Sequence, residues 1–165
     1  MAIKITFLGA GSSVFVRNVL GDCIIHPELE DLTFALYDID AQRLEDSYLM
    51  LHAICAHYGK SVKMEKYVGV EELPQALTGA NFLICAIQVG GYDPCTISDF
   101  EIPKKYGLRQ TIADTLGVGG VFRALRTIPV MEMFGKMAEK YCPNAVFLNY
   151  SNPMGMLSGY MERYC

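Results

Sequence analysis

The stretch IKITFLGAGSS, residues 3–13, decides how the chain folds. An apolar run here meets two glycines separated by one residue, and an amphipathic segment follows. This order is typical of the strand–turn–helix that begins a dinucleotide-binding βαβ unit. Gly9 permits a tight turn, and Gly11 leaves the main chain bare enough for a pyrophosphate to approach. Ser12 or Ser13 is predicted to cap the helix, whose free amides and positive dipole end hold the anion.

The third glycine of such a turn is missing, because Val14 stands in its place. Support comes from the next apolar run, residues 33–37, which ends in Asp38. An acidic residue at the end of the second strand accepts hydrogen bonds from the adenosine ribose hydroxyls. It also repels a 2′-phosphate, so Asp38 favours NAD over NADP. The alternative is that Asp38 only caps the helix beginning at Ala41, a role that Asp40 fills better.

Strand-like and helix-like apolar patterns alternate along the chain, with short connections between them. We predict an α/β fold: a Rossmann-like, doubly wound and mainly parallel sheet with helices on both faces. The whole chain, residues 1–165, is predicted to be one NAD-binding domain. No strand follows the last predicted helix, so we expect a sheet incomplete at the C-terminus, in the N-terminal part of a larger protein. The strands are predicted near residues 4–8, 33–37, 62–68, 81–87 and 145–149.

The composition excludes several classes of function. Net charge is −4 and the basic residues are scattered, which argues against nucleic acid as a partner. No stretch is long and apolar enough to span a membrane, and no secretory signal is present, so we expect a cytoplasmic protein. The six cysteines include no CxxC pair and are predicted to be reduced thiols. Hydrophobic residues make up 52% of the chain, which indicates either a well-buried parallel sheet or a face covered by something outside this chain. We expect a homo-oligomer.

Two segments after the fourth predicted strand are rich in glycine and polar side chains. Gln88 and Gly90 follow that strand directly, at the edge of a parallel sheet where ligands gather, and are cofactor-binding candidates. Residues 106–120 lack a clear period, and three glycines there suggest a second close approach of backbone to ligand. Asp114 lies in this segment and is a substrate-binding candidate. Arg123, near the start of the next helix, either reaches the ligand or is solvated.

Asparagines follow the fifth predicted strand. Asn149 and Asn152 stand at its end, and Pro153 comes next. An amide both donates and accepts hydrogen bonds, so it can bridge a cofactor and a substrate. Both asparagines are therefore substrate-binding candidates.

Together these motifs resemble the NAD- and manganese-dependent family 4 glycoside hydrolases, over essentially the whole chain. The absence of the third glycine is also usual in that family. The motifs that carry the resemblance are GAGS (9–12), YDID (37–40), QVGGY (88–92), DTLGVGG (114–120), RALRTIP (123–129) and NYSNP (149–153).

One position narrows the substrate that the resemblance implies. Relatives that cleave 6-phospho-glycosides carry an arginine where this chain has Gln88, because a guanidinium pairs with the sugar phosphate. A neutral amide supplies no such charge. The segment therefore looks like the α-galactosidase (melibiase) branch, which takes unphosphorylated sugars. An α-glucosidase or α-galacturonidase activity stays open.

The resemblance also implies a mechanism without the usual pair of catalytic carboxylates. Hydride passes from C3 of the sugar to NAD⁺, and the resulting ketone acidifies the C2 proton. A base removes that proton, the C1–O bond breaks by elimination, water adds, and the hydride returns. Gly9, Gly11, Ser12 and Asp38 are assigned to NAD, and Asn152 matches the sugar-contacting asparagine. The resemblance also makes Asn149, Asp114 and Gln88 substrate-side candidates.

No catalytic or metal-binding residue is predicted within this chain. In the family, the metal-binding cysteine and histidine and the tyrosine base follow the Asn-Pro motif by more residues than remain after Pro153. His26, His52 and His57 lie too early to replace them. The Mn²⁺ implied by the resemblance therefore has no predicted ligands here, and we expect the 165-residue chain to be inactive by itself.

Two other functions remain open from the sequence. A lactate- or malate-dehydrogenase relative has a similar fold, but needs an arginine–histidine pair for its keto acid, and no histidine follows His57. A stand-alone nucleotide-binding or oligomerising module would need no catalytic residues at all.

Overall fold

The computed structural model describes residues 2–111 and 115–165. Five strands form one sheet in the order β3-β2-β1-β4-β5, and β1 pairs in parallel with both β2 and β4. The predicted α/β class and parallel sheet are thus confirmed. The strands are β1 (Ile3–Leu8), β2 (Leu32–Asp38), β3 (Lys63–Val68), β4 (Phe82–Cys85) and β5 (Val146–Asn149).

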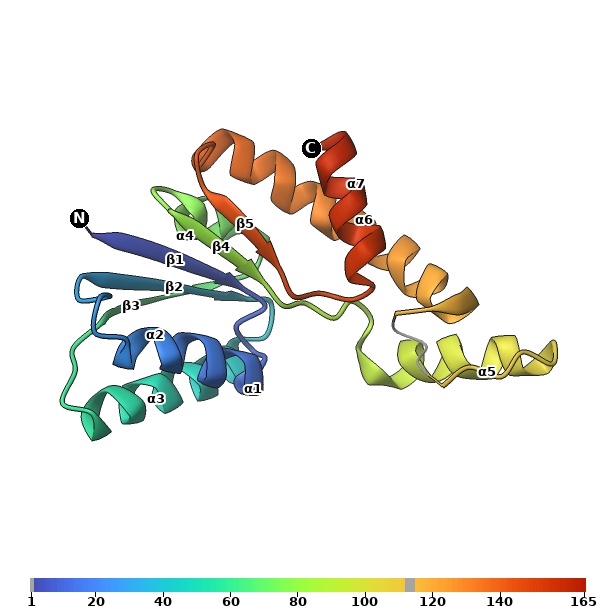
Figure 1. The fold of residues 1–165 in the computed structure, drawn as a ribbon, viewed down its shortest axis with the longest axis horizontal. Coiled ribbons are helices and arrows are strands. Elements are labelled where there is room, and N and C mark those ends of the chain that lie inside the picture. The colour runs from blue at the N-terminus through green and yellow to red at the C-terminus, as the bar shows by residue number, and fades with distance from the viewer. Residues whose placement is uncertain (1, 112–114) are drawn as a thin grey trace. The chain divides into compact units, whose positions relative to one another are not determined.

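Helical segments connect the strands (Figure 1). They are α1 (Ser13–Phe15), π-helical η1 (Val16–Leu20), α2 (Gly21–Ile25), α3 (Ala41–His57), η2 (Val70–Glu72), α4 (Leu73–Leu77), π-helical η3 (Gly91–Thr96), α5 (Ile97–Lys105), α6 (Gly117–Tyr141) and α7 (Met154–Tyr164). The described residues separate into two compact units. The first unit is Met1–Ile87 with Met137–Leu148, and the second is Gln88–Lys136 with Asn149–Cys165.

Helices cover both faces of the sheet in the first unit, as predicted. Figure 1 shows α2 and α3 on one face and α4 on the other. Ile5 and Phe7 of β1 belong to the main apolar core with α2 and α3, whereas Thr6 points the other way and donates to the Ala76 carbonyl of α4 at 2.7 Å. All three side chains are buried. A strand buried on both faces reads as a continuous apolar run, which accounts for the high hydrophobic content.

The helix structure after β4 was not predicted. Residues 91–96 form η3 and continue into α5, although the extended backbone of Asp93 interrupts η3. Pro103 lies inside α5, and Pro94 follows the break at Asp93, so local propensity argues against a helix in this region.

The six cysteines are free thiols, as predicted. Among the described residues, no helix combines the length and apolar character that crossing a bilayer requires.

Candidate functional site

The glycine turn after β1 is held by backbone hydrogen bonds from neighbouring strands. The amides of Gly9 and Ala10 both donate to the Tyr37 carbonyl at 2.9 Å, at the end of β2. Gly9 has φ +91°, and a Cβ there would lie 2.5 Å from the Ala86 carbonyl oxygen just beyond β4. Only glycine fits a positive φ between two such strands. The predicted tight turn is therefore present at the carboxyl ends of the central strands.

Asp38 contacts this turn directly. Its Oδ2 accepts from the Gly11 amide at 2.6 Å, and its Oδ1 accepts from the Asp40 amide at 2.9 Å. A Cβ on Gly11 would lie 2.8 Å from the same Oδ2, so the bare glycine lets the carboxylate reach the turn. The sequence brought Gly11 and Asp38 to one site but did not reveal that they bond to each other. Each carboxylate oxygen accepts one of these two bonds and has the capacity to accept a further hydrogen bond.

The helix cap before α3 belongs to Asp40. Its Oδ1 accepts from the amides of Gln42 and Arg43 at 3.0 and 3.1 Å. The prediction that Asp40 fills the capping role better than Asp38 is confirmed.

The expected serine cap is absent from the helix after the glycine turn. Ser12 occupies the cap position of α1, but its side chain makes no capping hydrogen bond. The regular part of α1 ends at Phe15, where the π-helical η1 begins. Ser12 is half-buried and Ser13 is exposed. Their predicted contact with a cofactor stays a prediction.

Gln88 and Gly90 begin the second unit. Gln88 is exposed, and its Nε2 donates to Thr96 Oγ1 at 3.0 Å. Thr96 Oγ1 in turn donates to the Gly91 carbonyl at 3.3 Å. Gly90 has φ +86°, and a Cβ there would collide with the Cys95 side chain. The segment is thus a closed, hydrogen-bonded turn, with the Gln88 amide on its surface.

A buried ion pair that the sequence did not reveal fixes this turn. Arg126 of α6 donates from Nη2 to Asp99 Oδ2 of α5 at 2.6 Å and from Nη1 to Asp99 Oδ1 at 3.3 Å. The Nε of Arg126 donates to the Val89 carbonyl at 3.1 Å. The hydrogen bond with Asp99 raises the pKa of the Arg126 guanidinium, against the effect of burial. The two side chains are 27 residues apart, and no local pattern connects them.

Replacing Asp99 by asparagine is expected to lower the free energy of unfolding by about 2–3 kcal/mol. Asp99 is almost fully buried, so its substitution leaves the Arg126 charge without its counter-charge. Breaking a fully buried pair costs about 3–5 kcal/mol, and the partial exposure of Arg126 reduces this cost. The measurement is urea unfolding followed by circular dichroism. The matched control is Glu132→Gln, which breaks the surface pair with Lys136 and is expected to change the free energy of unfolding far less than Asp99→Asn does. Equal costs for the two variants would contradict the structural role of Asp99.

The segment before α6 is organised by Gln110. Its Oε1 accepts from the Gly119 amide at 3.0 Å, and its Nε2 donates to the Leu116 carbonyl at 3.3 Å. A Cβ on Gly120 would lie 3.1 Å from the Thr115 carbonyl oxygen. The Gly120 backbone lies close to that of Thr115, and the predicted approach of a ligand to these glycines stays a prediction. Asp114 lies outside the described residues, so its predicted role stays a prediction.

The turn after β5 is held by side chains of α6 and α7. Asn149 donates from Nδ2 to Ser158 Oγ at 3.1 Å, and its Oδ1 accepts from the Ser151 amide at 2.8 Å. Arg123 is only 8% exposed, and its Nε donates to the Asn152 carbonyl at 3.1 Å. The alternative of a solvated Arg123 is therefore wrong. The Asn149 amide holds the turn together on both of its polar atoms, while Asn152 is half-buried.

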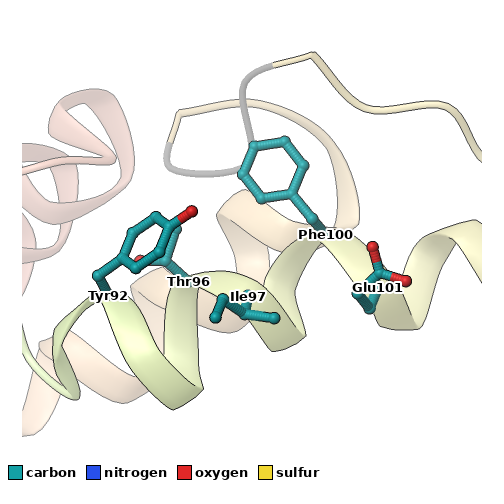
Figure 2. Close-up of a pocket in the computed structure, with 5 residues that line it drawn as sticks. All are labelled: Tyr92, Thr96, Ile97, Phe100 and Glu101. Atoms are coloured by element: carbon teal, nitrogen blue, oxygen red, sulfur yellow. The ribbon is translucent and has the colours of Figure 1, made fainter.

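A pocket of about 330 Å³ lies along η3 and α5 (Figure 2). It is lined by Tyr92, Thr96, Ile97, Phe100 and Glu101. Thr96 is the hydrogen-bond partner of Gln88, but no predicted site residue lines the pocket. Within residues 2–111 and 115–165, no group of three histidine, cysteine, aspartate or glutamate side chains is placed to hold a metal ion.

Comparison with known proteins identifies relatives of the whole chain. The model of the family described as Family 4 glycosyl hydrolase matches residues 4–165. An α-galactosidase of Bacillus subtilis is 56% identical over 161 residues, which are 98% of this chain and 37% of that protein. An α-galacturonidase of Thermoanaerobacter italicus is 36% identical over 155 residues, 93% of this chain and 32% of that protein. The chain thus spans about a third of the length of these curated relatives.

Solved structures agree with this result. The 6-phospho-β-glucosidase of Thermotoga maritima, solved with manganese, NAD⁺ and glucose-6-phosphate, has a TM-score of 0.82 at 26% identity, over 98% of this chain and 37% of that one. A malate dehydrogenase of Picrophilus torridus has a TM-score of 0.69 at 14% identity, over 99% of this chain and 42% of that one, which shows the shared fold alone. The family match, the α-galactosidase similarity and the glycine–aspartate turn lead to one conclusion: the chain belongs to family 4 of the glycosyl hydrolases.

Proposed function

We propose that this chain is the NAD-binding part of an α-galactosidase-like glycosidase and that it also supplies side chains to the sugar site. The contact between Asp38 and the Gly11 amide carries the cofactor half of the proposal. The 56% identity to an α-galactosidase supports the sugar half. Because the chain spans about a third of such relatives, the complete reaction is proposed for the whole enzyme.

The glycine turn fits the shape and charge of NAD. Gly9 and Gly11 carry no side chain that would obstruct a pyrophosphate, and an added Cβ at either position would meet Ala86 or Asp38. Asp38 is half-buried, and its oxygens have acceptor capacity left for two ribose hydroxyls. Its negative charge disfavours a 2′-phosphate. The residues present therefore suit NAD better than NADP.

When bound, NAD⁺ supplies a reversible hydride acceptor for C3 of the sugar, and the nicotinamide is regenerated at the end of the cycle. Gly9, Gly11 and Asp38 would hold the cofactor and fix its orientation, together with Ser12 and Ser13. Gln88 and Gly90 are separate cofactor-binding candidates. The Asn152 and Gln88 amides would contact the glycoside, with Asn149 and Asp114 as further candidates. The neutral Gln88 amide favours an unphosphorylated glycoside.

Manganese is proposed for the whole enzyme, because the Thermotoga maritima structure contains it together with NAD⁺. The metal would polarise the sugar oxygens as a Lewis acid. No cluster of metal-binding side chains lies among the described residues, so its ligands are proposed to lie elsewhere in the enzyme.

The 165-residue chain is expected to bind NAD without hydrolysing an aryl α-galactoside in the presence of Mn²⁺. The described residues hold no metal cluster and no base assigned to the C2 proton. The measurements are calorimetry with NAD and release of the aryl alcohol against a buffer blank. Turnover above the blank would contradict the assignment of catalysis to other parts of the enzyme. Absence of NAD binding would contradict the cofactor assignment.

The setting of the protein is also proposed. Six free thiols support a reducing compartment such as the cytoplasm, with a glycoside as the small-molecule partner and neither nucleic acid nor membrane involved. Exposed apolar side chains such as Leu125 and Met154 support self-association into a homo-oligomer.

A further inference from the structure

Two arginines stand one helical turn apart on α6 and reach two different loops. The Nε of Arg123 donates to the Asn152 carbonyl in the turn after β5. The Nε of Arg126 donates to the Val89 carbonyl in the turn after β4. Both distances are 3.1 Å, and all of these residues belong to the second unit. Positions three residues apart share one face of a helix, so a single rigid element contacts both turns.

Arg126 is divided between two partners. Its Nη atoms pair with the buried Asp99 carboxylate, which neutralises the guanidinium and fixes its plane. The Nε is then left to hold the Val89 carbonyl. Gly90 packs against the same side chain, since a Cβ there would lie 3.1 Å from Arg126 Cδ. The planar guanidinium has donors on two edges, so it can bond to Asp99 and to the Val89 carbonyl at once, which a lysine ammonium cannot do in this geometry.

Arg123 holds the turn after β5. Asn149 already ties the turn to Ser151 and Ser158. The Arg123 bond adds a contact at the carbonyl of Asn152 itself, the residue next to Pro153. Because Arg123 is 8% exposed, little water is available to replace it. The backbone that carries the Asn152 amide is therefore fixed at several points.

We propose that Arg123 and Arg126 are positioning residues for the sugar site, with α6 as the spacer that sets the distance between Gln88 and Asn152. This inference rests on the proposed function, which places a glycoside against those two side chains. Neither arginine touches the sugar. Each arginine acts through a backbone carbonyl, so that the side-chain amides of Gln88 and Asn152 contact the same ligand in a fixed geometry. Preorganised polar groups of this kind raise affinity by reducing the ordering that binding requires.

The test compares three variants of the chain with one control. Arg126→Lys keeps a positive charge beside Asp99, so it is less disruptive than a neutral substitution. A lysine cannot bond to Asp99 and to the Val89 carbonyl at the same time. Arg123→Met removes the bond to Asn152, and Arg123→Lys can restore a donor. Arg163→Lys, on an exposed position of α7, is the matched control.

The first measurement follows glycine amide resonances in ¹H–¹⁵N spectra and needs no ligand. Arg126→Lys is expected to shift or broaden Gly90 and Gly91 and to leave Gly155 unchanged. Gly155 lies at the start of α7, three residues after Asn152. Arg123→Met is expected to shift the Gly155 resonance and to leave those of Gly90 and Gly91 unchanged. Arg123→Lys is expected to return the Gly155 resonance toward its wild-type position. Loop resonances that stay at their wild-type positions in both Arg126→Lys and Arg123→Met would overturn the positioning role.

The second measurement is calorimetry with methyl α-galactoside and, separately, with AMP. Arg126→Lys and Arg123→Met are each expected to weaken galactoside binding by roughly 10-fold, as the loss of one ordered contact implies. AMP binding, which reports on Gly11 and Asp38, is expected to stay within about twofold, and Arg163→Lys to change neither. Equal losses for galactoside and AMP would show a general structural effect and overturn the proposal. A wild-type chain that binds no galactoside would overturn the proposed substrate, and the resonances would still decide whether the arginines position the turns.

Discussion

Substitution of Asp38 by asparagine is expected to weaken NAD binding by roughly 10- to 100-fold, since a hydrogen bond to a charged group is worth about 1.5–3 kcal/mol. The carboxylate accepts from the Gly11 and Asp40 amides with different oxygens. An asparagine amide presents a second donor in place of one of those oxygens, so one of these backbone amides loses its acceptor. The ribose loses its charged acceptor at the same time. The substitution therefore affects both the cofactor contact and the turn that presents it.

The two effects of this substitution separate by experiment. The free energy of unfolding without cofactor is expected to fall by about 1 kcal/mol, the net worth of one hydrogen bond, because asparagine can keep the Gly11 amide bonded and leave the exposed Asp40 amide to water. Calorimetry with NAD and urea unfolding on the same sample measure both quantities. Asp40→Asn is the matched control, because asparagine caps a helix about as well as aspartate and Asp40 is assigned no cofactor contact. Wild-type NAD affinity in Asp38→Asn would contradict the role of the carboxylate.

Substitution of Gly9 by alanine is expected to destabilise the fold by roughly 2–5 kcal/mol. Its φ of +91° is strained for any other residue, at about 1–2 kcal/mol. The new Cβ would also lie 2.5 Å from the Ala86 carbonyl oxygen. That neighbour is backbone at the end of a central strand, so relief requires the sheet to shift, at about 1–3 kcal/mol.

Gly79→Ala is the matched control for Gly9→Ala. Gly79 has φ +74°, but nothing lies within 4 Å of its added Cβ. Its substitution is expected to cost about 1 kcal/mol, from strain alone. Unfolding by urea, followed by circular dichroism, compares the two. Equal costs would contradict the close approach between the glycine turn and β4.

The features that sequence could predict are those with local causes. A few neighbouring residues are enough to predict the two-glycine turn, the apolar strands and the position of Asp38. Their structural consequences follow from backbone geometry. The Asp40 cap belongs to the same class, since it acts on amides two and three residues away.

The features that sequence missed depend on distant partners. The Arg126–Asp99 pair joins α6 to α5, and Arg123 reaches a carbonyl 29 residues away. A sequence shows the charges but not the partners, which is why Arg123 could be assigned equally to a ligand or to solvent. The η3–α5 region was missed for another reason. Tertiary contacts, including those of Arg126 and Asp99, stabilise α5 through Pro103 against local preference, whereas η3 is interrupted at Asp93, directly before Pro94.

Calorimetric titration of NAD into the 165-residue chain tests the central claim most directly. The account predicts saturable binding at one site per chain, weakened by Asp38→Asn and unchanged by Asp40→Asn. NADP, whose 2′-phosphate would face the Asp38 carboxylate, is expected to bind at least about 10-fold more weakly. Absence of NAD binding by the folded chain, or equal affinity for NAD and NADP, would contradict the account.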